Sequence, residues 1–211
     1  MARRGAALRE HILDSAKVAF LETGFERSSM DAIAARAETS KRSLYAYFPT
    51  KDALFLAVIE HMRELFDERT HDPAHYGADP VEAMVRYCLR LTQLLRWTSV
   101  VQTLRLAIAE ADRLPQIASG LYDVLLGNTA KTLTAHIAAN FPLSPAACRQ
   151  VAEQLVALTV HPLMPRVLTG VEPTVDDLPA EGAAAKRGEL ARIREAARML
   201  LREAERGGAA E

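Results

Sequence analysis

The stretch SMDAIAARAETSKRSLYAYFPTK, residues 29–51, decides the fold of this chain. It predicts two short helices joined by a tight turn at Glu38-Thr39. The second helix carries cations, hydroxyls and phenols on its outer side, whereas Leu44 and Phe48 point inward. This pattern is typical of a helix-turn-helix, in which the first helix braces the second and the second enters the major groove of DNA.

The residues before this stretch predict another helix, over positions 5–22. Apolar side chains recur there every three or four positions, which is the period of an amphipathic helix. Gly24 follows as a left-handed stop, a role that glycine commonly takes at helix ends. The apolar stripe consists of Leu8, Ile12, Leu13, Ala16, Ala19 and Phe20.

Residues with short oxygen-bearing side chains stand where the helices are expected to begin. Ser28 or Ser29 is expected to cap the second helix and Thr39 or Ser40 the third, because such side chains accept a hydrogen bond from a free backbone N–H. Thr50 is the expected cap of a longer fourth helix, which reaches about residue 69 and has an apolar face.

The rest of the chain is also predicted to be helical. After a turn-rich segment at 71–80, helices are expected near residues 80–97, 99–112, 115–141, 144–169 and 186–206, with a loop at 170–183. Pro162 and Pro165 should kink the 144–169 helix or end it early. No segment shows sustained alternation of polar and β-branched residues. The predicted fold class is therefore all-α, with a three-helix helix-turn-helix DNA-binding head at 1–51 and a larger helical-bundle domain at 52–211.

Composition narrows the class of protein further. The 211 residues include 49% hydrophobic ones, enough for a sizeable core, and no long apolar run predicts a membrane span. Residues 1–51 contain 9 Lys/Arg and 6 Asp/Glu, a net +3, so the remaining residues carry −4 of the total −1. A mildly basic head on an acidic body can face phosphates without general attraction to polyanions. Two distant cysteines, Cys88 and Cys148, fit a reducing cytoplasm, and no cofactor or nucleotide motif is present.

With these elements in place, the chain resembles the TetR family of transcriptional regulators over about residues 8–58. The resemblance implies a homodimer whose helix-turn-helix heads sit on variable all-helical bodies, and a repressor that a small molecule releases from a pseudo-palindromic operator. Where family members often have Gly, this chain has Glu38, so the turn was expected to be built slightly differently. The residues that carry the resemblance are Ile12-Leu13, Ala16, Ala19-Phe20, Gly24-Phe25, Ser28-Ser29-Met30, Ile33-Ala34, Ala37, Ser40-Lys41, Leu44-Tyr45, Tyr47-Phe48, Lys51 and Leu54-Phe55.

The expected partner of the head is a double-stranded DNA operator. Arg42 is the best candidate for reading a base, because a guanidinium donates two hydrogen bonds to guanine, and Lys41 could read a base or bind phosphate. The resemblance assigns Ser29, Tyr45 and Lys51 to the DNA backbone and Ser43 and Tyr47 to the groove. The predicted DNA-binding residues are Ser29, Lys41, Arg42, Ser43, Tyr45, Tyr47 and Lys51.

The body is expected to bind a largely apolar small-molecule effector and to form the dimer. Apolar walls with a few polar groups define such a pocket, although the same stripe also fits a plain bundle core. The last two helices, about 147–168 and 186–206, carry apolar residues for a four-helix interface between subunits. The predicted ligand-binding residues are Trp97, Val101, Leu104, Arg105, Ile108, Tyr122 and Leu126.

The sequence also bears on metal binding, on redox sensing and on a rival class of protein. His71 and His75, with His61 nearby, match no usual metal-ligand spacing, so a solvated loop and no metal or other cofactor are expected. Cys88 and Cys148 are expected to be buried apolar residues and not redox sensors. The rival class is a helical enzyme or protein-binding adaptor that keeps the head for another use. It would require a titratable cluster in the body, and the sequence shows only scattered charges there.

Overall fold

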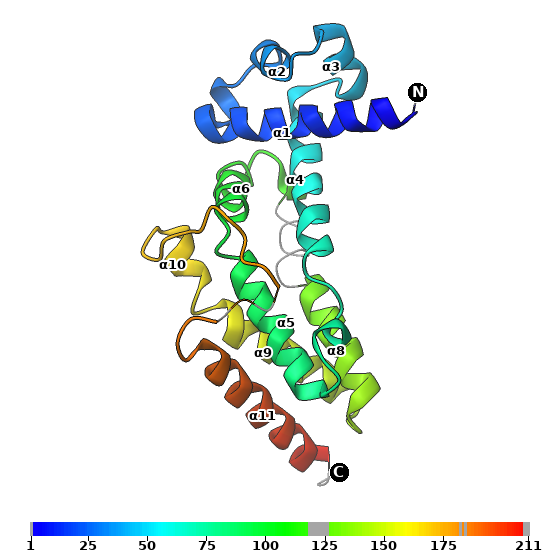
Figure 1. Ribbon diagram of the computed structural model, residues 1–211, viewed down its shortest axis with the longest axis vertical. Coiled ribbons are helices and arrows are strands. Elements are labelled where there is room, and N and C mark those ends of the chain that lie inside the picture. Colours follow the sequence, from blue (N-terminus) through cyan, green and yellow to red (C-terminus); the bar gives the residue numbers. More distant parts are fainter. Residues whose placement is uncertain (1, 118–126, 182, 184, 209–211) are drawn as a thin grey trace. The chain divides into compact units, whose positions relative to one another are not determined.

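A computed structural model describes residues 2–117, 127–181, 183 and 185–208, and every regular element in that part of the chain is a helix (Figure 1). The described residues contain only an isolated bridge between Trp97 and Val175 in place of a sheet. The all-α prediction is therefore confirmed. None of the helices in these ranges is both long and apolar enough to cross a bilayer.

The chain divides into two compact units, each described here by itself. Unit 1 comprises residues 1–65 and 102–121, and unit 2 comprises residues 66–101 and 122–211. The predicted boundary was at residue 51. The compact division differs because most of α4, Lys51–Glu68, and a later segment share the apolar core of the head.

Unit 1 contains the helix-turn-helix. It is formed by α1 (Ala2–Arg27), α2 (Met30–Arg36) and α3 (Lys41–Tyr47), and α4 follows directly. Two fully buried rings, Phe20 and Phe55, meet edge to face with their centroids 5.2 Å apart, and Phe25 lies 5.1 Å from Phe55. Ala107, Leu114 and Ile117 complete this core from the second segment of the unit. The predicted apolar stripe of α1 is buried here from Ile12 to Phe20.

The predicted helix caps are confirmed and their alternatives resolved. Ser29 Oγ accepts from the N–H of Ala32 at 3.1 Å, and Ser40 Oγ accepts from the N–H of Ser43 at 3.0 Å. Thr50 Oγ1 accepts from the N–H of Ala53 at 3.0 Å. Each cap satisfies one of the free N–H groups at a helix start and fixes where that helix begins.

The turn between α2 and α3 differs from expectation. Glu38 adopts a left-handed backbone, with φ of 47°, although a non-glycine residue there costs about 1–2 kcal/mol. The N–H of Thr39 donates to the carbonyl of Ala34, and the N–H of Glu38 donates to that of Ala35. This is the Schellman ending of a helix, with glutamate where glycine is usual. The prediction of a different turn was wrong, because these two bonds hold the usual geometry.

Glu38→Gly is therefore expected to stabilise the protein. Relief of the left-handed strain, less the greater freedom of glycine in the unfolded chain, should raise the free energy of unfolding by about 1 kcal/mol and Tm by about 2–4 °C. Glu38→Ala is the control, since it removes the same charge and keeps Cβ. An equal rise of Tm in both variants would assign the effect to charge and contradict the backbone account.

Gly24 interrupts α1, as predicted, but not in the left-handed α conformation. Its φ of 78° and ψ of 163° lie in a region that is essentially reserved for glycine. Helical turns resume beyond it and reach Arg27. The chain is thereby redirected just before the buried Phe25 and the start of α2.

Unit 2 is a bundle of helices. It contains η1 (Pro73–Tyr76), α5 (Pro80–Leu94), α8 (Asn128–Asn140), α9 (Pro145–Val160), α10 (Met164–Leu168) and α11 (Glu189–Gly208), and α6 (Thr98–Ala109) begins in it and continues in unit 1.

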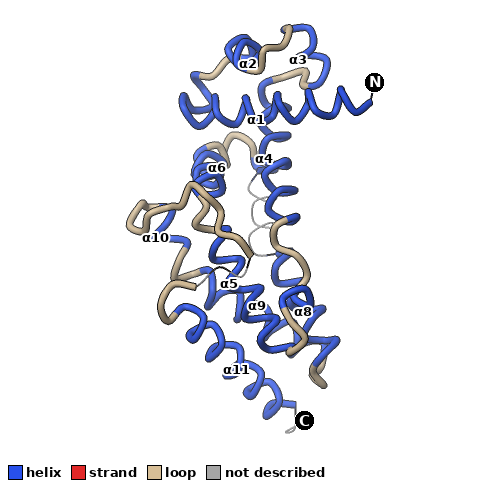
Figure 2. Tube along the Cα trace, in the orientation of Figure 1, coloured by secondary structure: helices blue, strands red, loops and turns tan. Residues whose placement is uncertain are grey.

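Of the predicted helices in the body, one is divided and another can be compared with the structure only in part. The segment 144–169 is divided between α9 and α10, as predicted from Pro162 and Pro165. Of the predicted 115–141 helix, α8 covers Asn128–Asn140, and residues 118–126 lie outside the described ranges. A long loop joins α10 to α11, shown in tan in Figure 2.

Candidate nucleic-acid interface

The recognition helix α3 has one buried and one exposed side. Leu44 is fully buried and Phe48, its C-cap, is 4% exposed. Lys41, Arg42 and Tyr45 are on the exposed side, and Tyr45 leaves 47% of its surface in solvent. Because α3 spans only about two turns, its position depends on this apolar anchor and on the turn at Glu38 rather than on its own helix propensity.

Several of the predicted DNA-binding side chains have a partner within the protein. The Lys41 ammonium lies 2.6 Å from Asp31 Oδ2, with both side chains more than half exposed. The Ser43 hydroxyl lies 2.8 Å from that of Ser40, and the Tyr47 hydroxyl donates to the carbonyl of Gly5 at 3.2 Å. Ser29 caps α2 as described above. Ion pairs this exposed are worth little, so Lys41 can exchange Asp31 for a phosphate at small cost.

Arg42 and Tyr45 differ from the other candidates. Within the described residues, neither the Arg42 guanidinium nor the Tyr45 hydroxyl has a hydrogen bond or an ion pair. Arg42 is the second residue of α3, and the first turn of a recognition helix is where side chains reach base edges. Its planar group therefore presents a full set of donors to solvent at the position where base contacts are made.

Lys51 points into the protein instead of outward. Its ammonium donates to three carbonyls, those of Phe25 at 2.8 Å, Glu26 at 3.2 Å and Ser28 at 3.1 Å. It also lies 4.3 Å from the centroid of the Phe25 ring. Lys51 thus binds the carbonyl end of α1 and orients the start of α4. A phosphate contact by this ammonium would require some of these bonds to break.

Sequence reasoning missed a second cation at the same ring. Arg113 lies 3.9 Å from the centroid of Phe25, 2.7 Å from Asp52 Oδ1 and 2.9 Å from Glu110 Oε2. It comes from the second segment of unit 1, so it joins that segment to the start of α4. The contacts of Arg113 with Asp52 and Phe25 span 61 and 88 positions of the chain, and no local pattern in the sequence marks these two.

The predicted ligand-binding residues do not form one described cavity. Trp97 and Val101 belong to unit 2, whereas Leu104, Arg105 and Ile108 belong to unit 1. Tyr122 and Leu126 lie outside the described residues. Val101 and Leu104 are buried core residues, and Ile108 is 53% exposed. Trp97 donates through Nε1 to the carbonyl of Asp176 at 3.0 Å.

A hollow among the described residues of unit 2 lies elsewhere, between α8 and α9, which pack side by side. It has a volume of about 970 Å³ and opens to solvent, and small side chains such as Ala135, Ala138 and Ala157 leave it room. His161, one of the polar groups expected in a ligand site, borders it. We call this hollow the α8–α9 groove. Its other lining residues are Gly127, Ala130, Lys131, Thr134, Arg149, Glu153, Val156, Val160, Met164 and Pro165.

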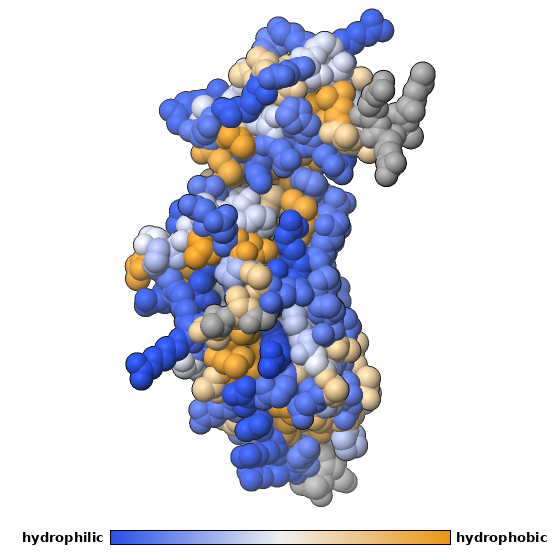
Figure 3. Space-filling view, in the orientation of Figure 1, coloured by the Kyte–Doolittle hydropathy of each residue, from blue (hydrophilic) through white to orange (hydrophobic). Residues whose placement is uncertain are grey.

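The apolar stripe of α11, which is expected to contribute to the dimer face, is covered within one chain. Ile193, Ala197 and Leu200 are at most 5% exposed, and α11 packs on α5 and α9. Arg194 donates to both carboxylate oxygens of Glu82, at 2.5 and 2.8 Å, and pins α11 to α5. Toward the C-terminal end of α11, the surface visible in Figure 3 is mostly hydrophilic. The helix therefore offers a second subunit little apolar surface.

An ion-pair network precedes α11. Glu172 receives hydrogen bonds from Lys186 at 2.5 Å and from Arg96 at 2.7 Å, and Arg96 also lies 2.9 Å from Glu189. Burial alone would raise the pKa of Glu172, but the bonds from Lys186 and Arg96 outweigh it and lower the pKa to about 2. The network joins the α10–α11 loop to α5 and α11.

Glu172→Gln is expected to destabilise the protein at neutral pH by about 2 kcal/mol, after allowing for the exposure of Lys186. Because the folded-state pKa is depressed, this stabilisation is present above the unfolded pKa of about 4.3 and is lost as pH falls toward the folded value. Urea unfolding of wild type and variant at pH 7 and at about pH 3, where about half of the effect should be lost, measures it. If the difference in the free energy of unfolding between wild type and Glu172→Gln is the same at both pH values, the role of the charge is contradicted.

The fold and this site define a helix-turn-helix protein with a helical body. Residues 12–58 match the family model of bacterial regulatory proteins of the tetR family, and residues 82–202 match the C-terminal domain of AefR-like transcriptional repressors. The chain belongs to the TetR family of transcriptional regulators. The family consists of regulators, and the chain is not an enzyme.

Individual relatives agree with this assignment. The transcriptional regulator UidR of Escherichia coli K12 is 32% identical to this chain over 131 residues, which is 62% of each protein. The repressor KstR of Rhodococcus jostii is 31% identical over 88 residues, which is 42% of this chain and 41% of KstR. The chain thus spans between about two fifths and three fifths of these relatives. Among solved structures, the flavonoid-responsive regulator FrrA has a TM-score of 0.73 at 25% identity, covering 94% of this chain and 97% of FrrA. A TetR-family regulator from Mesorhizobium loti has a TM-score of 0.71 at 20% identity, covering 95% and 98%.

Proposed function

We propose that this protein is a cytoplasmic transcriptional repressor that binds a pseudo-palindromic DNA operator as a homodimer and leaves it when a small molecule binds in the body. The observation that carries the proposal is the exposed side of α3, where Arg42 and Tyr45 have no partner among the described residues while Leu44 and Phe48 anchor the helix. Such a helix fits the major groove with its first turn against the bases.

In this proposal the residues of the head divide into three roles. Arg42 reads a base, and Lys41, Ser43, Tyr45 and Tyr47 contact phosphates or groove edges around it. Ser29 acts through the start of α2, whose N–H groups favour an anionic partner. Lys51 positions α1 and α4 through its bonds to the carbonyls of Phe25, Glu26 and Ser28.

DNase I footprinting on the region upstream of the protein's own gene tests the operator. The expected result is protection of two half-sites centred about one helical turn, 34–36 Å, or a multiple of it apart. A single unpaired half-site, or protection that disappears with competitor DNA, would contradict a dimeric sequence-specific repressor.

We infer that the dimer forms through the α8–α9 groove and not through α11. Support comes from the small residues that line the groove and from the covered apolar stripe of α11. Ala157 is an exposed residue of α9 that lines the groove, and Met199 is an exposed residue of α11. Light scattering should find Ala157→Glu monomeric and Met199→Glu dimeric. If the α11 variant is monomeric and the α9 variant is dimeric, the interface lies on α11 instead.

The proposed effector is a planar, largely apolar molecule held near Trp97. Trp97 is the proposed contact among the described residues of unit 2, and the flavonoid response named for FrrA supports an aromatic class. Trp97 is the chain's only tryptophan, so its fluorescence reports binding directly. Titration with a flavonoid panel should quench it saturably and release the operator. Saturating quenching with unchanged DNA affinity would contradict effector control, since a ligand must bind the two states differently.

A further inference from the structure

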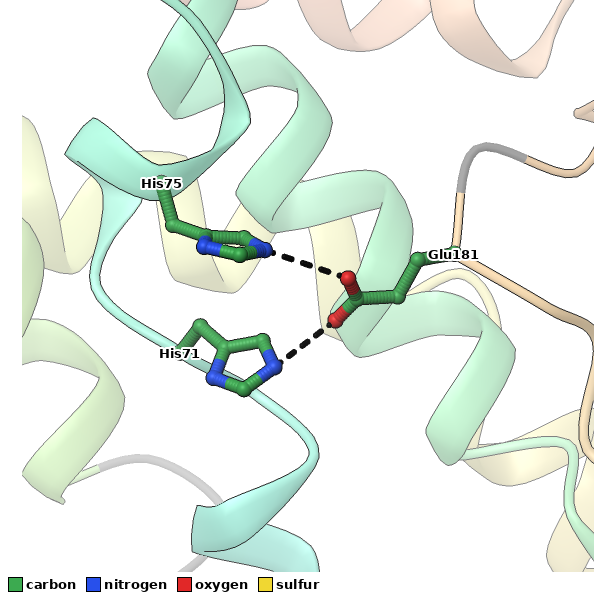
Figure 4. Close-up of side chains that lie close together, drawn as sticks. All are labelled: His71, His75 and Glu181. Carbon is green, nitrogen blue, oxygen red and sulfur yellow. Dashed lines mark hydrogen bonds and ion pairs between the residues drawn. The ribbon is translucent and has the colours of Figure 1, made fainter.

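Three side chains in unit 2 converge on one point of the surface, although the sequence separates them widely. His71 precedes η1, His75 lies in η1, and Glu181 lies in the α10–α11 loop (Figure 4). His71 Nε2 is 3.0 Å from Glu181 Oε1, and His75 Nε2 is 3.1 Å from Glu181 Oε2. One ligand atom from each of the three residues falls within 4.8 Å of the others. We propose that these residues bind a zinc ion that crosslinks the segment after α4 to the loop before α11.

The ligand set fits Zn²⁺. Two imidazole nitrogens and one carboxylate are borderline-soft ligands that suit zinc, and three protein ligands leave a position for water. Zinc–nitrogen and zinc–oxygen bonds of about 2.0–2.2 Å place neighbouring ligand atoms of a tetrahedron about 3.3 Å apart. The two observed nitrogen–oxygen separations are close to that value. The nitrogens contact different oxygens of Glu181, so the carboxylate has to rotate to bring one oxygen between them and admit the ion.

The backbone around the three ligands is held in place by a buried arginine. Arg90, 6% exposed, donates through Nε to the carbonyl of Arg69 at 3.0 Å and through Nη1 to that of Pro179 at 2.7 Å. Arg90 therefore holds both segments that carry the ligands. Each of these two bonds is to a residue two positions before a ligand in the sequence. A site whose supports are rigid loses less entropy when it binds a metal.

Further contacts shape the segment with the two histidines. The Tyr76 hydroxyl donates to the carbonyl of Thr70 at 2.8 Å, which closes the loop around His71 and His75. Asp72 caps η1 through the N–H of Ala74 at 2.9 Å. His71 has a left-handed φ of 40°, a conformation that histidine enters more readily than most residues. The rings of His71 and His75 lie with their centroids 4.4 Å apart as a result.

This proposal departs from the expectation drawn from the sequence. That expectation is a solvated loop, because His71 and His75, with His61 nearby, match no usual metal-ligand spacing. The third ligand, Glu181, is 106 positions beyond His75. The two cysteines are fully buried elsewhere and do not compete as ligands. Exposed His–Glu ion pairs contribute little to stability. A bound metal would therefore explain better why these three side chains lie together.

Zinc titration of tag-free, chelator-treated full-length protein tests the proposal without DNA or effector, so its outcome is independent of the repressor function. Calorimetry with ZnCl₂ should give one ion per chain. His71→Ala, His75→Ala and Glu181→Gln should each weaken binding by about 100-fold or more, since even outer-shell partners are worth about 10–100-fold. His11→Ala is the matched control, because His11 is an exposed histidine of unit 1, and it should bind zinc like the wild type.

Two further readouts make the test decisive. Co²⁺ in place of Zn²⁺ should give visible d–d bands without a thiolate charge-transfer band, as expected for nitrogen and oxygen ligands. Zinc should raise Tm of the wild type and of His11→Ala but not of Glu181→Gln, whose metal-free Tm checks that it folds. No binding at micromolar zinc, or equal affinity in the Glu181→Gln and His11→Ala variants, would overturn the proposal and leave an ion pair only.

Discussion

Arg42→Ala is expected to weaken operator binding by about 2–6 kcal/mol, or roughly 30-fold to more than 10⁴-fold. One bidentate contact between arginine and guanine is worth about 1–3 kcal/mol, and a homodimer makes two of them. The guanidinium has no ion pair within the described residues, so its loss should not disturb the fold. Anisotropy on a labelled operator duplex measures the change, with a scrambled duplex to measure nonspecific affinity.

Arg42→Lys distinguishes a base contact from a phosphate contact. Lysine keeps the charge but lacks the planar fork, so operator affinity should fall while the dependence on salt stays the same. Changing one base pair at a time should then show relaxed discrimination at one position of each half-site. Full operator affinity in Arg42→Lys would mean that Arg42 serves only as a charge, and would contradict the base-reading role.

Lys51→Met is expected to lower the free energy of unfolding by about 3 kcal/mol and Tm by about 6–12 °C. The substitution keeps an apolar stem beside Phe25 but leaves the carbonyls of Phe25, Glu26 and Ser28 without their shared donor. Charged hydrogen bonds of this kind contribute about 1.5–3 kcal/mol each and are not additive. Thermal unfolding followed by circular dichroism gives the value directly.

The salt dependence of DNA binding shows which role Lys51 has. A lysine on phosphate contributes about one unit to the slope of log affinity against log salt, or about two units for a dimer. Lys41→Met, which removes an exposed lysine of the recognition helix, should reduce the slope in this way with little change of Tm. Lys51→Met should change Tm and leave the slope nearly unaltered. A reduced slope with an unchanged Tm would instead support a phosphate clamp.

The head could be predicted from the sequence because its determinants are local. The stripe from Ile12 to Phe20 and the caps Ser29, Ser40 and Thr50 each act within about one helical turn of their own position, and all take the expected places. The conformation of Glu38 was not anticipated. Two backbone hydrogen bonds outweigh an unfavourable residue there, and a propensity argument does not include them.

Contacts between distant segments account for what the sequence did not reveal. The family resemblance assigned Lys51 to the DNA backbone. It did not indicate that the ammonium of Lys51 turns toward the carbonyl end of α1. Arg113 meets Phe25, and Glu181 meets His71 and His75, across 88 to 110 positions of chain. The apolar stripe of α11 looked available for a partner, because only the folded bundle shows that α5 and α9 cover it.

The measurement that tests the central claim most directly is anisotropy of the purified protein on a labelled duplex from upstream of its own gene, with excess nonspecific DNA, across a salt series. We predict tight binding that resists competitor and is lost in Arg42→Ala with the dimer intact. Binding that vanishes with competitor or modest salt, and that is the same in wild type and Arg42→Ala, would mean phosphate attraction alone and would contradict the account.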